Sequence, residues 1–163
     1  MPRLPAEWSL SLPALPSLRL GSCDLDGNPH VGRALAVDAL PDGRLLVLMA
    51  ECAAPRVVAA VRETAQVALL ATSPRSNRTL HVKGHDARVA PAQRSHAALL
   101  MLRRDTLARE LADVDGFAGA PFLDHWYGIA AHAITAITFS VAGAWNQTPG
   151  PDAGQAIALE PDA

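Results

Sequence analysis

The sequence predicts a small, mainly β protein of the α+β class, in which about six antiparallel strands form a barrel with helices at its ends. Short apolar and β-branched runs are separated by tight turn signals, as in antiparallel sheets. Two segments instead repeat apolar residues at helical spacing. The chain of 163 residues is long enough for a core of its own, and neither a repeat nor a linker divides it. We therefore expect one domain over 1–163.

Three strands are expected after a Pro-rich segment at 1–16, which we expect to be an irregular arm on the surface. The first strand, 17–25, ends at the turn signal "DGN" at 26–28, because Gly and Asn tolerate a positive φ. The runs 29–40 and 44–50 follow, separated by a second short turn. Strands joined by such turns pair as an antiparallel meander.

The middle of the chain predicts a helix between strands. Val57, Val58 and Val61 recur at helical spacing within 55–64. A short apolar strand is expected at 66–71. After a polar loop, the stretch "NRTLHVKGHDARV" at 77–89 is expected to be another strand.

The C-terminal half predicts a long helix and one more strand. The helix at 91–114 has an apolar stripe with charges opposite, formed by Ala97, Leu100, Met101, Leu107 and Leu111. A loop with a short helix is expected at 116–130, and a β-branched strand at 133–145. The tail at 146–163 is rich in Pro and Gly. Its "QTPGP" stretch would either pack stiffly on the protein or form a lid over a ligand.

The strand at 77–89 has an unusual polar face. Alternate residues of a strand share a face. This places a hydroxyl, two imidazoles and an ammonium group together, on Thr79, His81, Lys83 and His85. Either this face is simply solvated or an anionic ligand lies on it.

Composition excludes several classes of function. A formal net charge of −2 and a pI near 6.3 argue against a general nucleic-acid binder. The sequence contains no run of about 18 apolar residues, the length that could cross a bilayer, so no membrane partner is expected. Cys23 and Cys52 are too few ligands for a structural zinc site. We expect a cytoplasmic protein with reduced thiols, in which Cys52 is a small buried side chain.

The order of these segments resembles the pyridoxamine 5′-phosphate oxidase-like family. The matching pieces are "DGNPHVGRALAV", "APRVVAAVRETAQVALLATSPRSNRTLHVKGHDARV" and a late strand that ends in Trp145. The resemblance implies a six-stranded antiparallel Greek-key split β-barrel with flanking helices. It also implies a homodimer that binds flavin mononucleotide (FMN) at the subunit interface.

The resemblance also implies which residues bind the cofactor. One strand would run along the flavin, and it comprises Arg33, Ala34, Leu35, Ala36 and Val37. Arg33 and Arg56 resemble the family's phosphate-binding arginines, as guanidinium groups bind phosphate bidentately. Thr79 falls where members often place a Gln that touches the ring system. His81 and Lys83 would face the cofactor or the partner subunit.

Two positions depart from the family's pattern. Glu51 stands where members place Ser or Thr before the helix, and Val57 stands where they place Lys or Arg. A carboxylate at Glu51 would lie beside the cofactor phosphate, where a like charge costs binding energy. Either Lys83 or Arg62 compensates this charge, or the ligand is different, or the site is degenerate.

The resemblance implies an FMN-dependent oxidoreductase that acts on a small molecule of unknown identity. A true pyridoxamine phosphate oxidase is not expected, because the C-terminal Arg/His cluster of those enzymes is missing. No catalytic residue can be named, since the cofactor carries the chemistry in flavoenzymes. The alternatives are a non-enzymatic flavin- or haem-binding module, a deazaflavin-dependent reductase, and a structural dimer with an empty site. His125, His132, Trp126 and Trp145 are expected to be structural.

Overall fold

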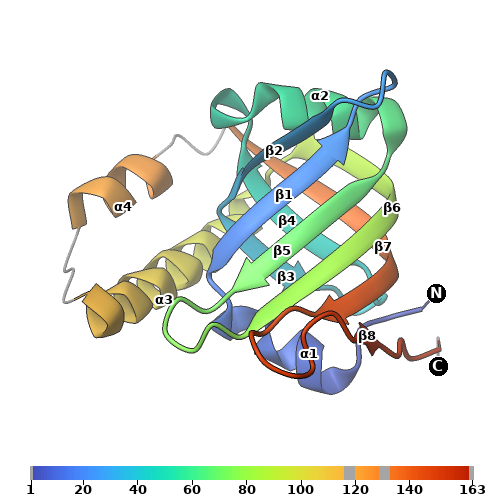
Figure 1. Ribbon diagram of the computed structural model, residues 1–163. Coiled ribbons are helices and arrows are strands. Elements are labelled where there is room, and N and C mark those ends of the chain that lie inside the picture. The colour runs from blue at the N-terminus through green and yellow to red at the C-terminus, as the bar shows by residue number, and fades with distance from the viewer. Residues whose placement is uncertain (1, 116–119, 129–132, 162–163) are drawn as a thin grey trace.

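The computed structural model describes residues 2–115, 120–128 and 133–161 (Figure 1). Its centre is a curled antiparallel sheet with the strand order β2-β1-β5-β6-β7-β4-β3, and β8 pairs with β7. The strands are β1 (Ser17–Cys23), β2 (Pro29–Ala34), β3 (Ala36–Ala39), β4 (Leu45–Ala50), β5 (Val67–Thr72), β6 (Thr79–Pro91), β7 (Ile134–Asn146) and β8 (Ala156–Ile157).

The two ends of the sheet are consecutive in the chain, and this closes the curl into a barrel. Only Leu35 separates β2 from β3, and its N–H donates a hydrogen bond of 2.8 Å to the carbonyl of Leu48. Taken as one bent strand, 29–39 pairs with β1 through its first half and with β4 through its second. The predicted antiparallel barrel is thus confirmed. The sheet has eight strands where six were expected, because 29–39 is divided into β2 and β3 and the tail adds β8.

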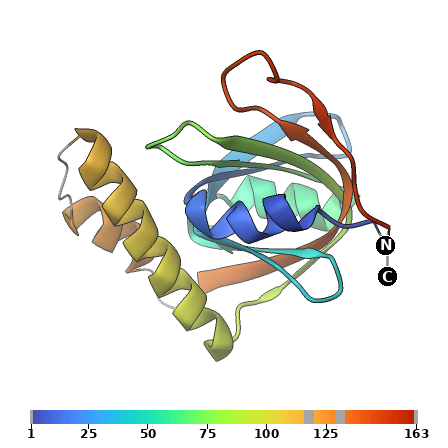
Figure 2. The ribbon, with the colours of Figure 1, turned by 90° about the horizontal axis from the view of Figure 1, so that it is seen from below.

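Helices cover both ends of the barrel and one side of it (Figures 1 and 2). α1 crosses one end and α2 covers the other, while α3 and α4 lie outside the sheet. The helices are α1 (Ala6–Ser11), α2 (Pro55–Thr64), α3 (Ala97–Asp115) and α4 (Ala120–Tyr127), and short 3₁₀ turns occupy Leu12–Ala14, Glu51–Ala53 and Arg94–His96. No helix among the described residues is long and apolar enough to cross a membrane.

The N-terminal segment is not the irregular surface arm that its prolines suggest. Pro5 precedes α1 and Pro13 lies in the first turn of the following 3₁₀ helix, positions where proline is compatible with a helix. Four large apolar residues of this segment recur every three or four positions and are buried in the core: Leu4, Trp8, Leu12 and Leu15. The segment therefore closes one end of the barrel.

Two apolar clusters hold the fold together. The first fills the barrel, where inward residues of the strands pack around the fully buried Phe139 and the valines of α2. The second lies outside the sheet, between β3, β4 and β7 and the α3–α4 pair. Because both faces of β4 are covered, all six of its residues are buried, which explains its unbroken apolar sequence.

The buried side of α3 differs from the stripe expected from the sequence. Leu107 is buried, but Ala97 and Met101 are exposed, with Met101 at 53%. The position between Leu100 and Leu107 on the inner side is Arg103, which is 1% exposed. A charged residue therefore stands in the apolar interface between α3 and the sheet.

Candidate functional site

The alternation predicted for the stretch 77–89 is present in β6. Leu80 and Val82 are fully buried, and Gly84 faces the ring of Phe139 in the core. The polar side chains lie on the opposite, outer face of the barrel. They line two adjoining hollows there, one with Thr79 and His81 and the other with Lys83 and His85.

The outer face joins residues of five strands in one row that is charged at one end and aromatic at the other. Strand pairing sets these residues directly opposite one another from β2 to β7, in the order Arg33, Arg19, Leu70, His81 and Trp145. Side chains of such pairs start about 4.5–5.5 Å apart. The row therefore has two guanidinium groups at one end and two aromatic rings at the other.

A second row beside it forms the floor of a trough. Its members pair in the order Val31, Gly21, Ala68, Lys83 and Gly143. Three of them have at most a methyl group as side chain, so the surface is recessed there. The two hollows, of about 760 Å³ and 550 Å³, share Gly21, Val31 and Ala68 and thus form one continuous trough on this face, which is turned to the viewer in Figure 1.

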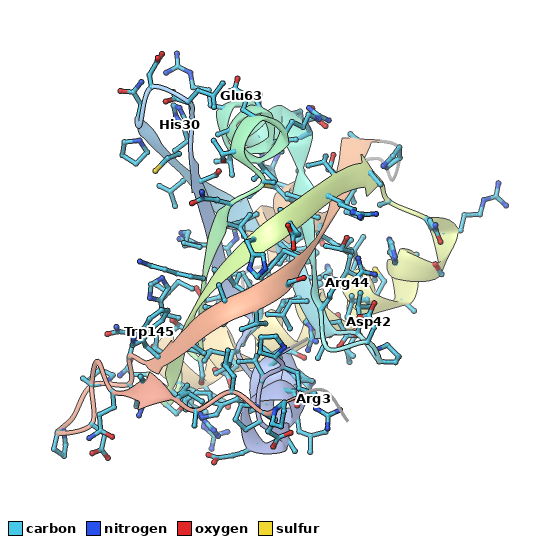
Figure 3. All side chains as sticks on the ribbon, turned by 90° about the vertical axis from the view of Figure 1, so that its right-hand side faces the viewer. Arg3, His30, Asp42, Arg44, Glu63 and Trp145 are labelled. Carbon is cyan, nitrogen blue, oxygen red and sulfur yellow. The ribbon has the colours of Figure 1, made fainter. Side chains whose placement is uncertain are left out.

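Trp145 stands at the aromatic end of the outer row, opposite His81. Its ring lies over Gly143, where an added Cβ would be 2.7 Å from the indole. The ring centroids of Trp145 and His81 are 5.5 Å apart with a tilt of 34°, and Lys83 Nζ lies 5.7 Å from the indole centroid. Figure 3 shows Trp145 on the outer side of the sheet. An aromatic surface beside a cation suits a planar anionic ligand.

His81 is the imidazole of this row. Burial lowers its pKa below the ordinary value of 6.5, and the positive charge of Lys83 lowers it further. The ring is therefore neutral at neutral pH. A neutral imidazole can stack on a ligand or coordinate a metal ion.

Thr79 fixes the C-terminal turn beside the trough. Its N–H donates to Thr148 Oγ1 at 3.0 Å, and its carbonyl accepts a hydrogen bond of 2.8 Å from the N–H of Gln147. Its hydroxyl donates to the carbonyl of Asn77 at 2.9 Å. The turn at 147–154 between β7 and β8 is thus packed on the barrel. This agrees with the expectation that the "QTPGP" stretch packs stiffly on the protein.

The strand that was expected to run along a flavin is covered in the single chain. Ala34 and Val37 belong to the barrel core, and Leu35 and Ala36 pack toward α3 and α4. The Tyr127 hydroxyl donates to the carbonyl of Leu35 at 2.9 Å. These residues therefore support the trough and do not line it.

Glu51 is neutralised by a residue of α2. Arg62 donates two hydrogen bonds to its carboxylate, at 2.7 and 3.1 Å, and the Thr135 hydroxyl donates a third at 2.8 Å. The Arg62 hydrogen bond, followed by that of Thr135, lowers the pKa of Glu51. Of the two residues expected to compensate Glu51, Arg62 does so.

Arg56 lies in a different setting from Arg33. It is exposed in the first turn of α2 and lines a hollow with Asp24, His30 and Glu63. Figure 3 labels His30 and Glu63 at this end of the barrel. Two carboxylates share that hollow, which is unfavourable for a phosphate. Val57, where the family places a cation, is 2% exposed and belongs to the core.

The remaining candidates do not form a site among the described residues. Cys23 and Cys52 are free and exposed, so the expected burial of Cys52 is wrong. The described part of the chain contains no group of side chains arranged to hold a metal ion. His125 is exposed, whereas His132 and the side chain of Trp126 lie outside the described residues.

Sequence reasoning missed Arg19 as a member of the outer row. Its neighbours Leu18 and Leu20 are buried, and this alternation could have indicated that Arg19 points outward. Its position opposite Arg33 depends on the register of two strands, which alternation alone does not give.

Comparison with known proteins supports the fold. No model of a known protein family matches the sequence, and no curated protein matches it. An FMN-binding protein from Syntrophomonas wolfei superimposes with a TM-score of 0.53 at 12% identity, over 86% of this chain and 84% of that one. HutZ, a heme storage protein from Vibrio cholerae, superimposes with a TM-score of 0.50 at 16% identity, over 88% of this chain and 94% of HutZ. HupZ of group A Streptococcus superimposes with a TM-score of 0.55 at 10% identity, over 93% of this chain and 100% of the HupZ chain.

The chain shares their fold. At these identities the likeness concerns the fold alone. The ligands of those proteins are therefore hypotheses for this one.

Proposed function

We propose that this protein binds a planar anionic cofactor of the flavin type in the outer trough, with FMN as the first choice. It would use the cofactor to transfer hydride or electrons to a small molecule. The observation that carries this proposal is the outer row, in which Arg33 and Arg19 stand opposite His81 and Trp145 across the sheet. Guanidinium groups bind phosphate, and aromatic rings stack on a flavin ring.

The residues present fit such a ligand. Burial and, after it, the neighbouring charge of Arg19 lower the pKa of Arg33 to about 10. Arg33 still carries its charge at neutral pH, so an anion near both guanidinium groups would offset their repulsion. Trp145 and His81 would hold the ring system, while Lys83 would favour an anionic form of the ligand. Thr79 would fix the turn that borders the trough.

A bound flavin supplies hydride and single-electron transfer. The chain's own part is to bind the phosphate, hold the ring against the sheet and exclude water from one of its faces. Glu51 and Arg56 are left out of this assignment. Glu51 is already paired with Arg62, and Arg56 lies beside two carboxylates.

The working form proposed here is a homodimer, as the family resemblance implies. Val31 in the trough is 73% exposed and Leu70 is 38% exposed, and a partner subunit would cover such apolar side chains. Light scattering at micromolar concentration should give about twice the chain mass of 17.1 kDa. A monomer under those conditions would contradict the homodimer.

Haem is the second candidate ligand, and His81 favours it. Its imidazole is neutral at neutral pH and lies on the trough, so it could coordinate an iron atom. A similar fold is found in the heme storage protein HutZ. In this case His81→Ala should abolish haem binding, whereas it should only weaken a stacked flavin.

A visible absorption spectrum tests the proposal directly. Purified protein is measured as isolated, and again after addition of FMN and desalting. Retention of about one oxidised flavin per chain supports the flavin site, and a Soret band supports haem. Protein that retains neither ligand would contradict both proposals and leave the fold as the only likeness.

A further inference from the structure

Arg103 is a buried cation that its own chain satisfies only in part. Its side chain is 1% exposed in the interface between α3 and the sheet. Nε and Nη2 donate to the carbonyl of Val37, at 3.2 and 2.6 Å. Nη1 is buried and has no hydrogen-bond acceptor among the described residues. Such a donor costs free energy unless a partner is supplied from elsewhere.

No carboxylate of the described residues forms an ion pair with Arg103. Burial lowers its pKa, and the charge of the Asp38 carboxylate acts in the opposite direction. The next residue, Arg104, differs in this respect, since it pairs with both Asp105 and Asp124. A buried guanidinium group without a counterion is an unusual and costly arrangement.

Further positive charge surrounds the same part of β3. Tyr127 donates its hydroxyl hydrogen to Leu35, and Arg103 donates to Val37 two residues along the same strand. Burial raises the pKa of Tyr127, while the charges of Arg33, Arg103 and Arg104 lower it. The phenol thus lies within electrostatic reach of all three guanidinium groups, and Arg104 among them is paired with carboxylates of α3 and α4.

We propose that Arg103, Arg33 and Tyr127 form a binding site for a phosphate group at the bend between β2 and β3. A phosphate monoester carries up to two negative charges and several acceptor oxygens, which suits a buried guanidinium donor and a neighbouring cation. Arg33 also belongs to the outer row, so it connects this cluster with the trough. That this phosphate belongs to the cofactor rests on the proposed function, whereas the site itself rests on the buried Arg103.

Inorganic phosphate tests the site without any flavin. Arginine side-chain ¹⁵N–¹H NMR spectra of the unmodified protein are recorded during a phosphate titration, and the Arg103 signal is assigned by triple-resonance correlation of the side chain with its own backbone. The signal of Arg103 should shift in a saturable way, while that of the exposed Arg109 should not. An Arg103 signal that stays fixed through the titration would overturn the proposal, even if every Arg103 variant failed to fold.

The preference for FMN over riboflavin tests the link to the cofactor, because riboflavin lacks the phosphate. Arg103→Gln should reduce FMN affinity about tenfold or more and leave riboflavin affinity nearly unchanged. Arg109→Gln, on the same helix, is the matched control and should change neither. Equal affinities of the unmodified protein for FMN and riboflavin would overturn the phosphate site while leaving flavin binding intact. A phosphate-dependent shift of Arg103 without flavin binding would support the site and contradict the cofactor.

Discussion

The ring of Phe139 occupies the space that a side chain at Gly84 would need: an added Cβ there would overlap three ring carbons. Gly84 lies on β6 where its pairing with β7 shifts register, directly after Lys83. Phe139 is fully buried in the barrel core. The strand that carries the polar outer face can therefore pass over the core only because position 84 has no side chain.

Gly84→Ala should lower the free energy of unfolding by about 1–3 kcal/mol, because overpacking displaces a fixed ring. Gly143→Ala is the matched control. Its Cβ would meet the outer end of Trp145, which can move into solvent, so it should cost less than about 1 kcal/mol. Urea denaturation of both variants measures the difference. Equal stabilities would mean that Phe139 has another position open to it.

Substitutions in the trough should weaken flavin binding, whereas Arg56→Gln should not. Trp145→Ala removes a stacking surface, and a loss of about 0.5–1.5 kcal/mol of binding free energy is expected. Arg19→Gln removes a charged donor, and a loss of about 1.5–3 kcal/mol is expected. Titration of FMN with detection of its fluorescence measures all three affinities.

The Arg56 variant decides between two locations of the cofactor phosphate. If Arg56→Gln reduced affinity as much as Arg19→Gln, the phosphate would lie at the first turn of α2. The assignment to the outer row would then be incorrect. An unchanged affinity for Arg56→Gln together with weaker binding by Arg19→Gln supports the trough.

Most of the barrel could be predicted from the sequence because local signals determine it. The turns at 26–28 and 41–43 and the alternation in β6 are visible in single short stretches. The N-terminal segment that closes one end of the barrel was missed, because its prolines suggested an irregular chain. The four-residue spacing of Leu4, Trp8 and Leu12 was the signal for it.

The candidate site was harder to predict because it depends on contacts between distant segments. Arg103 lies on a helix whose other charged residues are solvated, and only the packing of α3 on the sheet buries it. Arg33 was selected from the family resemblance, but its neighbour Arg19 requires the register between β1 and β2. Pairing register and helix packing are tertiary properties that periodicity does not contain.

Asp24 should give the turn between β1 and β2 a measurable pH dependence. The His30 hydrogen bond, at 3.0 Å, and the Asn28 N–H lower the pKa of Asp24 from 3.8 to about 2. Since the pKa in the folded state is depressed, the stabilising effect is complete above pH 3.8 and is lost as the pH falls toward 2. His30→Phe should raise the pKa of Asp24 toward its ordinary value.

Carboxyl ¹³C NMR titration measures this shift in both proteins. The unmodified protein should titrate at Asp24 near pH 2, and the His30→Phe variant clearly higher. The acid limb of the stability curve should begin at a higher pH in the variant. Identical titrations would show that the backbone N–H groups of the turn hold the carboxylate without His30.

The helix that closes the barrel should be essential for stability. Trp8 is 9% exposed in the core, and the guanidinium carbon of Arg78 lies 4.5 Å from its ring centroid. Trp8→Ala should therefore lower the free energy of unfolding by about 3–5 kcal/mol, since it leaves a large cavity. Leu10, two residues along the same helix, is 79% exposed, so Leu10→Ala should change stability by less than about 0.5 kcal/mol. Chemical denaturation of the two variants compares them directly, and a similar small effect of both would mean that α1 lies on the barrel without closing it.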